Sequence, residues 1–170
     1  LERAFEARGA SVHKLTNLAS NELENAIPAF LSSLSQPPYA LWISYSGHAV
    51  QLNGRNFLLG IDSDFSSASR IRGFGVDLDR VIGLVERAKP VAAVISVDAC
   101  RNNPFEPEVT RGAVSGLAAT DPRGLCVSFS TAPYMRALDG EAGQNSPYAS
   151  ALANALAGKQ NKSLDAILRE

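Results

Sequence analysis

The sequence predicts an α/β fold in which helices lie on both faces of a mostly parallel central sheet. Segments with the apolar pattern of a strand alternate along the chain with amphipathic helical segments. Two strand-like segments, 39–45 and 91–97, are nearly continuous apolar runs, as expected for parallel strands that are buried on both faces. The 170 residues suffice for one sizeable core, so we expect residues 1–170 to form a single domain.

Composition excludes several classes of function. The net charge of -1 gives no support for binding nucleic acid or an anionic membrane surface. No apolar run is long enough to span a bilayer. The two cysteines, Cys100 and Cys126, and the two histidines, His13 and His48, lack the spacing of a disulfide framework or a zinc site. We therefore expect free thiols, no bound metal and a reducing, cytoplasmic location.

The first half of the chain contains two helical patterns, two strand patterns and a hairpin. The helical segment 22–34 carries an apolar stripe, with Pro28 as a candidate kink. The Asn53-Gly54 pair is a strong hairpin signal. In order, we expect a helix over 1–8, a strand over 11–15, the helix 22–34, the strand 39–45, the hairpin 50–59 and a polar loop over 62–69.

The second half continues the alternation. In order, we expect a helix over 76–88, the strand 91–97, a loop over 101–123, a strand over 125–131, a second loop, and helices over 146–156 and 163–170. Pro147 suits the first turn of its helix, and Gly158 suits the stop. The 101–123 loop is long for an unstructured connection, and such loops are usually functional or mobile.

Polar side chains follow both apolar strands. Ser46-Gly47-His48 follows the strand 39–45, and Asp98 and Cys100 follow the strand 91–97. Open α/β sheets bind ligands at the carboxyl ends of their strands. A histidine at this edge would be a general acid–base, and its proximity would favour the thiolate of a cysteine. The alternatives are a hydrogen-bonded structural histidine and a buried, inert thiol, which is how we interpret Cys126.

Three ordered motifs resemble those of a known family: Tyr45-Ser-Gly-His48, Asp98-Ala-Cys-Arg-Asn-Asn-Pro-Phe105 and Phe129-Ser-Thr-Ala-Pro133. They are similar to the two catalytic motifs and the groove strand of bacterial caspase-like cysteine peptidases, the orthocaspases and metacaspase-like members of peptidase family C14. The separation of His48 and Cys100, about 50 residues, agrees. The stretches Asp139-Gly140 and Asn145–Tyr148 also resemble the bacterial branch, and the resemblance covers residues 1–170.

The resemblance implies a caspase-like three-layer sandwich and a catalytic dyad. Cys100 would attack the peptide carbonyl, and His48 would transfer protons, above all to the leaving amine. The backbone N–H groups of Cys100 and Ala49 would form the oxyanion hole. Ala49 replaces the glycine that is usual in the family. Family domains begin with one further strand, so we expect this chain to lack the first strand of the fold.

The resemblance also implies a specificity. Relatives that cleave after Asp use a Gln and an Arg where this chain has Asp98 and, approximately, Asp139. The two carboxylates predict cleavage after Arg or Lys, with Arg favoured by bidentate pairing. Ser46 would line the same pocket. The alternatives are a strand-end cap for Asp98, a turn residue for Asp139 and a turn hydroxyl for Ser46.

Several functional questions stay open in the sequence. The 101–123 loop would separate the large-subunit-like and small-subunit-like parts, and Arg111 and Arg123 are candidate self-cleavage sites or solvated charges. No cofactor is required, but some relatives respond to calcium. Candidate ligands by residue type alone are Asp62, Asp64, Asp77 and Asp79, and their interpretation as solvated loop or helix-start carboxylates is favoured.

We expect a protein or peptide as substrate, and the sequence does not decide between a monomer and a homodimer. A catalytically weak caspase-fold module that regulates or binds peptides is the main alternative to a peptidase. A third reading, a domain that binds a small molecule, lacks support because no Gly-rich phosphate loop follows a strand.

Overall fold

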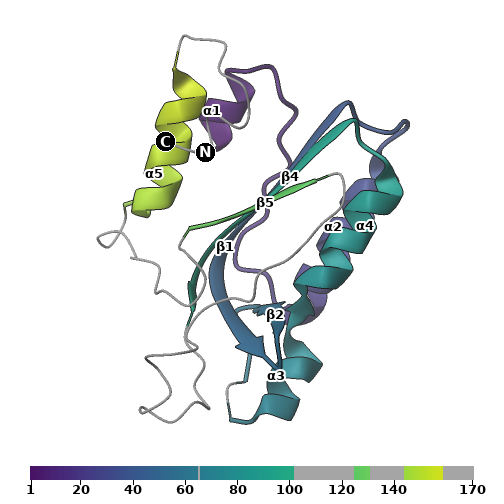
Figure 1. Ribbon diagram of the computed structural model, residues 1–170, viewed down its shortest axis with the longest axis vertical. Coiled ribbons are helices and arrows are strands. Elements are labelled where there is room, and N and C mark those ends of the chain that lie inside the picture. The colour runs from purple at the N-terminus through teal and green to yellow at the C-terminus, as the bar shows by residue number, and fades with distance from the viewer. Residues whose placement is uncertain (65, 102–124, 131–143, 159–170) are drawn as a thin grey trace. The chain divides into compact units, whose positions relative to one another are not determined.

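The computed structural model of the protein describes residues 1–64, 66–101, 125–130 and 144–158, with only the backbone of residues 100 and 101 (Figure 1). The chain forms two compact units. The larger comprises residues 17–137, and the smaller comprises residues 1–16 together with 138–170. The expectation of one domain over residues 1–170 stays a prediction.

A five-stranded mixed sheet is the centre of the larger unit. The strands are β1 (Ala40–Leu52), β2 (Arg55–Leu58), β3 (Val76–Asp77), β4 (Ala92–Arg101) and β5 (Cys126–Phe129), in the order β3-β2-β1-β4-β5. β1, β4 and β5 are mutually parallel, whereas β2 and β3 join by antiparallel pairing. The parallel arrangement predicted for the two apolar strands is therefore confirmed (Figure 1).

β1 and β4 extend beyond the ends that their apolar runs predict. Parallel pairing continues without interruption from Ala40 opposite Ala92 to Ala49 opposite Arg101. The polar residues that follow each run are therefore within the strands, and the prediction that they lie beyond the strand ends is wrong. The reason is that side-chain polarity marks the limit of the apolar core, whereas backbone hydrogen bonds set the limit of the ladder.

The last residues of β1 form a hairpin with β2, as predicted. Leu52 pairs with Arg55, and the connecting Asn53 and Gly54 have φ angles of 52° and 77°. Two successive positive φ angles are the requirement of a type I′ turn, which Asn-Gly meets at low cost. Along this edge β2 reaches only Ala49–Leu52, and no strand among the described residues pairs there with residues 40–48.

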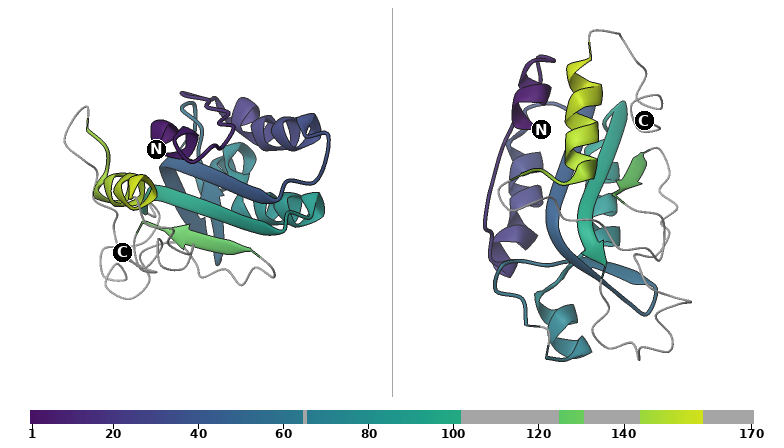
Figure 2. Two further views of the ribbon diagram at one scale, coloured as in Figure 1. Left: turned by 90° about the horizontal axis from the view of Figure 1, so that it is seen from above. Right: turned by 90° about the vertical axis from the view of Figure 1, so that its left-hand side faces the viewer.

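Helices α2 (Ser20–Ser33) and α4 (Leu78–Ala88) pack side by side on one face of the sheet (Figures 1 and 2). Their apolar stripes enclose the main core, whose members include Leu23 and Ile27 of α2, Val81 and Val85 of α4, and Ile95 of β4. The apolar periodicity of both segments thus becomes the helix–sheet interface. None of the helices in the described ranges is long and apolar enough to cross a membrane.

Three local expectations are wrong. Residues 68 and 69, expected to lie in the loop over 62–69, belong to helix α3 (Ala68–Phe74). The Ser67 hydroxyl caps this helix, and Ile71 is buried in the interior. Val76 and Asp77 form β3, so α4 begins two residues later than predicted. Residues 11–15 form no strand, although their composition favours one, because no described segment pairs with them.

The smaller unit joins helix α1 (Glu2–Glu6) to helix α5 (Pro147–Ala157). The Arg8 guanidinium donates to the carbonyl of Leu156 at 2.6 Å and to that of Gly158. Ser146 caps α5 by accepting from the Ala149 N–H at 2.9 Å, with Pro147 in the first turn and Gly158 at the end. The predicted limits of α5 are confirmed to within one residue, while the helix expected over 163–170 lies outside the described residues.

Candidate active site

The parallel register of β1 and β4 brings the two predicted catalytic residues side by side. His48 of β1 is the ladder partner of Cys100 of β4. Neighbouring strands are separated by about 4.8 Å, so the two backbones are in direct contact. The His48 residue is exposed near the end of this parallel ladder. Two sequence motifs about 50 residues apart thus meet at one point on the sheet.

Two of the predicted pocket residues meet in the same way, two positions upstream. Ser46 is the ladder partner of Asp98. Side chains two apart along a strand lie on the same face, so Ser46 and His48 share a face. Ser46 is exposed, whereas Asp98 is buried, with 8% of its surface exposed. Asp98 is thus an internal residue of β4 rather than a cap beyond the strand end.

The same face of the sheet carries a polar contact further from the site. Trp42 donates its indole N–H to the hydroxyl of Ser96 at 3.0 Å. Ser96 is fully buried, so this bond satisfies a hydroxyl that would otherwise be costly in the interior. The opposite face, with Ile95 and Val97, belongs to the apolar core under α2 and α4. β4 is therefore apolar on its helix-covered face and partly polar on the face that carries the candidate site.

The hydroxyl of Tyr45 ties the His48 backbone to the segment after β2. It lies 2.6 Å from the His48 carbonyl oxygen and 2.9 Å from the Leu59 carbonyl oxygen, and it accepts from the Leu59 N–H at 3.2 Å. The Leu59 N–H also donates to the His48 carbonyl at 3.0 Å. Burial raises the pKa of Tyr45 to about 12, so the phenol is neutral at physiological pH. In the sequence, only the position of Tyr45 within the histidine motif points to this role.

Ala49 is compatible with the backbone conformation at this point of β1. Ala49 is 2% exposed and pairs with both Leu58 and Arg101. Among the described non-glycine residues, positive φ angles occur at Asn17, Asn53 and Lys89, and Ala49 is not one of them. Its backbone therefore needs no glycine, and the alanine that departs from the family pattern is accommodated without strain.

Among the described residues, one further hydroxyl near the site has no hydrogen-bond partner. Ser130 follows β5, and its N–H donates to the Val97 carbonyl at 3.0 Å. Its Oγ is buried and makes no hydrogen bond. Buried polar atoms are nearly always satisfied, so this hydroxyl is an exception among the described residues. Ser130 belongs to the motif that resembles the groove strand, but the sequence predicted no role for it.

Several predicted residues lie outside the described part of the chain. These are Asp139 of the predicted pocket, Arg111 and Arg123 of the predicted self-cleavage sites, and nearly all of the 101–123 loop. Their proposed roles stay predictions.

Two of the candidate calcium ligands are engaged in local hydrogen bonds. One oxygen of Asp62 accepts from the N–H and the hydroxyl of Ser20, at 2.7 and 2.6 Å. Asp64 accepts from the Ser66 N–H at 2.8 Å. These bonds, from the Ser20 hydroxyl above all and from Ser66, lower the pKa values of the two carboxyl groups. Both carboxylates therefore organise the loop that follows the hairpin and the start of α2.

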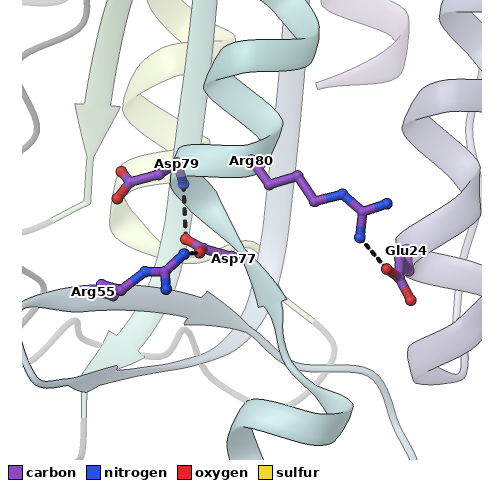
Figure 3. A network of polar contacts seen from close by, with 5 residues as sticks. All are labelled: Glu24, Arg55, Asp77, Asp79 and Arg80. Atoms are coloured by element: carbon purple, nitrogen blue, oxygen red, sulfur yellow. Dashed lines mark hydrogen bonds and ion pairs between the residues drawn. The ribbon is translucent and has the colours of Figure 1, made fainter.

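The other two candidates lie at the start of α4, in a polar network (Figure 3). Asp77 caps α4 by accepting from the Asp79 N–H at 3.0 Å and forms an ion pair with Arg55. Nearby, Arg80 pairs with Glu24 and joins α4 to α2. The described residues contain no group of three or more His, Cys, Asp or Glu side chains arranged to hold a metal ion. Asp77 thus acts as a helix cap here, and a response to calcium stays a prediction.

This network borders an open cavity of about 690 Å³ in the larger unit. Its lining includes Arg55, Arg72 and Arg80 together with Glu24, Asp62 and Asp77. The formal charges of these side chains cancel, and among the described side chains His48 does not contribute to the wall. The cavity is therefore distinct from the strand ends where the dyad residues meet.

Comparison with protein families agrees with this geometry. The family model described as the caspase domain of peptidase family C14 matches residues 1–170. No individual curated protein matches the chain. The match covers the whole chain and includes both strands that carry the dyad residues. The chain belongs to the caspase-domain family of cysteine-type peptidases, family C14.

Proposed function

We propose that the protein is a cysteine endopeptidase that uses His48 and Cys100 as a catalytic dyad. The single observation that carries this proposal is the ladder register, in which His48 is the direct partner of Cys100. A nucleophile and a base must lie within hydrogen-bond reach, and the pairing of these two positions on adjacent strands supports such a contact. The exposure of His48 supports access of a substrate from solvent.

The proposed reaction follows from the two side chains. The Cys100 thiolate attacks the carbonyl carbon of the scissile bond, and the carbonyl oxygen takes up negative charge. The His48 imidazolium donates its proton to the leaving amine as the C–N bond breaks, which leaves a thioester on Cys100. A water molecule then gives a proton to His48 and attacks the thioester. Cleavage of the C–S bond releases the carboxylic acid product and restores the thiolate–imidazolium pair.

Two backbone N–H groups would stabilise the oxyanion of each tetrahedral intermediate. We assign this role to the N–H groups of Ala49 and Cys100, one from each of the two paired strands. Loss of one such donor costs about 10²–10³ in rate in well-studied peptidases. The negative-φ backbone of Ala49 supports the assignment, because the N–H can keep its direction without a glycine at that position.

The proposed preference is for Arg or Lys on the amino side of the cleaved bond. Asp98 and Ser46 are ladder partners two positions before the dyad residues, and a buried carboxylate there would attract a cation. Arg would bind better than Lys because its guanidinium pairs with a carboxylate in two hydrogen bonds. Asp139 would add a second carboxylate, and cleavage after Arg111 or Arg123 would be the corresponding self-processing.

The first experiment tests the dyad. Fluorogenic peptides that end in Arg, Lys or Asp are incubated with the protein, with and without calcium. Turnover should be abolished by Cys100→Ala and His48→Ala and should be unchanged in Cys126→Ala, which removes the other thiol. Loss of turnover in Cys126→Ala alone, or turnover by Cys100→Ala, would refute the dyad. A folded chain that binds these peptides without cleaving them would instead be a peptide-binding caspase-fold module.

The second experiment tests the pocket. Asp98→Asn keeps the size and shape of the side chain but removes its charge, and Glu86→Gln makes the same change on the exposed surface of α4. Asp98→Asn should lower kcat/KM for Arg and Lys peptides by at least about tenfold, while Glu86→Gln leaves it unchanged. Preference of the wild-type protein for an Asp peptide would support the proposed peptidase activity but would refute the acidic pocket.

A further inference from the structure

Tyr45 and Gly47 form a compact arrangement around the backbone of His48. The Tyr45 side chain crosses Gly47, so that a Cβ on Gly47 would lie 2.7 Å from the tyrosine oxygen and 3.0 Å from Cζ. The glycine is therefore required by close approach and not by its φ angle, because Gly47 is not among the described glycines with a positive φ, which are Gly9 and Gly54. Glycine at this point lets the phenol reach across the strand to the residue after it.

The tyrosine hydroxyl has one proton and two carbonyl oxygens within reach. The His48 carbonyl, at 2.6 Å, is closer than that of Leu59, at 2.9 Å, and the Leu59 N–H donates back to the hydroxyl. The His48 carbonyl thus accepts from the Tyr45 hydroxyl and from the Leu59 N–H. Two donors from different parts of the chain hold this one oxygen.

Fixing the His48 carbonyl also fixes the next N–H. The peptide bond between His48 and Ala49 is trans, since no described bond is cis, and it is planar. In a trans peptide the N–H points away from the carbonyl oxygen. The carbonyl points to Leu59 on the β2 side of β1, so the Ala49 N–H points toward β4, the strand that carries Cys100.

We infer that the Tyr45 hydroxyl is a positioning group that holds the His48–Ala49 peptide unit and so aims the Ala49 N–H at the Cys100 side of β1. This inference rests on the proposed peptidase function for its catalytic consequence. Tyr45 touches neither substrate nor reacting atoms in this scheme. Its effect should therefore appear in the stabilisation of the transition state and not in the binding of the peptide.

The test compares Tyr45→Phe with Tyr39→Phe. Tyr39 is 79% exposed immediately before β1, so its variant removes a hydroxyl from a solvent-facing ring. For Tyr45→Phe, kcat should fall about fivefold to tenfold, the usual effect of one lost hydrogen bond, with KM changed less than about twofold. Tyr39→Phe should change neither. Equal kcat values for Tyr45→Phe and wild type, or a rise in KM alone, would overturn the inference.

Hydrogen exchange gives a readout that does not depend on activity. In Tyr45→Phe, the amides of Ala49 and Leu59 should exchange faster, while amides in the middle of β4 stay protected. Unchanged exchange at both amides would overturn the inference even in an active enzyme. If the wild-type protein cleaves no peptide, the proposed function fails, and the exchange result still decides whether Tyr45 holds this peptide unit.

A double-mutant cycle tests the contact with Gly47. Gly47→Ala alone should reduce kcat by displacing the tyrosine ring. In the Tyr45→Phe background the nearest obstacle, the hydroxyl oxygen, is absent, so the same alanine should cost less. Independent effects of the two substitutions would contradict the proposed arrangement.

Discussion

Replacing Gly60 with alanine should destabilise the larger unit. Gly60 follows β2 and Leu59, and it packs directly against the backbone at the start of α2. A Cβ at this position would lie 2.7 Å from the carbonyl carbon of Ala19 and 2.8 Å from the Cα of Ser20, with the Ser20 nitrogen closer still. All three obstacles are backbone atoms, so no side-chain rotation can relieve the contact.

The size of the effect follows from these distances. Ordinary carbon contacts are about 3.5–4.0 Å, so α2 and the segment after β2 must separate by roughly 1 Å. Overpacking of this kind costs about 1–3 kcal/mol, and rigid backbone on both sides places Gly60→Ala toward the upper end. For a chain of this size, 1 kcal/mol corresponds to about 2–4 °C in Tm. We therefore expect Tm to fall by roughly 4–10 °C.

Gly73→Ala is the matched control. Gly73 lies in α3, and a Cβ there would have no atom within 4 Å. Alanine in a helix is favoured over glycine by up to about 1 kcal/mol, so this variant should be equally or more stable than wild type. Thermal unfolding followed by the fluorescence of Trp42, the single tryptophan, measures Tm for both variants. If Gly60→Ala is as stable as Gly73→Ala, the backbone at the start of α2 does not approach Gly60 closely enough to exclude a methyl group, and the predicted overpacking is refuted.

Three further predictions concern single hydrogen-bonded groups. Because burial raises the pKa of Tyr45 to about 12, the folded protein holds the phenol proton more tightly than the unfolded chain. The free energy of unfolding should therefore fall as pH rises from about 10 to about 12, less so in Tyr45→Phe, and equal slopes in urea titrations would contradict this. Asp77→Ala should cost about 1 kcal/mol by removing the cap of α4, while Asp77→Asn retains most of that stability in thermal unfolding. Ser96→Ala should cost about 1–3 kcal/mol because the Trp42 indole N–H loses its acceptor, and an unchanged Tm would show that another group accepts it.

The strands that carry the candidate site, the hairpin and the family could all be predicted from the amino-acid sequence. The apolar, β-branched runs that precede Ser46 and Asp98 indicate buried strands without any knowledge of their partners. The Asn53-Gly54 pair predicts the hairpin because few other residues adopt two successive positive φ angles. The motifs around His48 and Cys100 predicted the family, which the match over residues 1–170 bears out.

The ends of elements were less predictable. Sequence patterns placed the polar residues after the two strands, whereas backbone pairing continues through Ser46 and His48 on β1 and through Asp98 on β4. α3 escaped prediction because its short segment is mostly exposed and only Ile71 anchors it. Residues 11–15 have the composition of a strand, but a strand also needs a hydrogen-bonded neighbour, which composition does not supply.

Local patterns and spacing in the sequence determine which residue types form the site, what chemistry they can perform and in which order their motifs occur. The direct pairing of His48 with Cys100 and of Ser46 with Asp98 depends on register, which long-range hydrogen bonds set between segments far apart in sequence. The hydrogen bond from Tyr45 to the His48 carbonyl depends likewise on Leu59, because the hairpin turn places Leu59 beside β1. Such contacts arise from the packing of distant segments, and no local pattern encodes them.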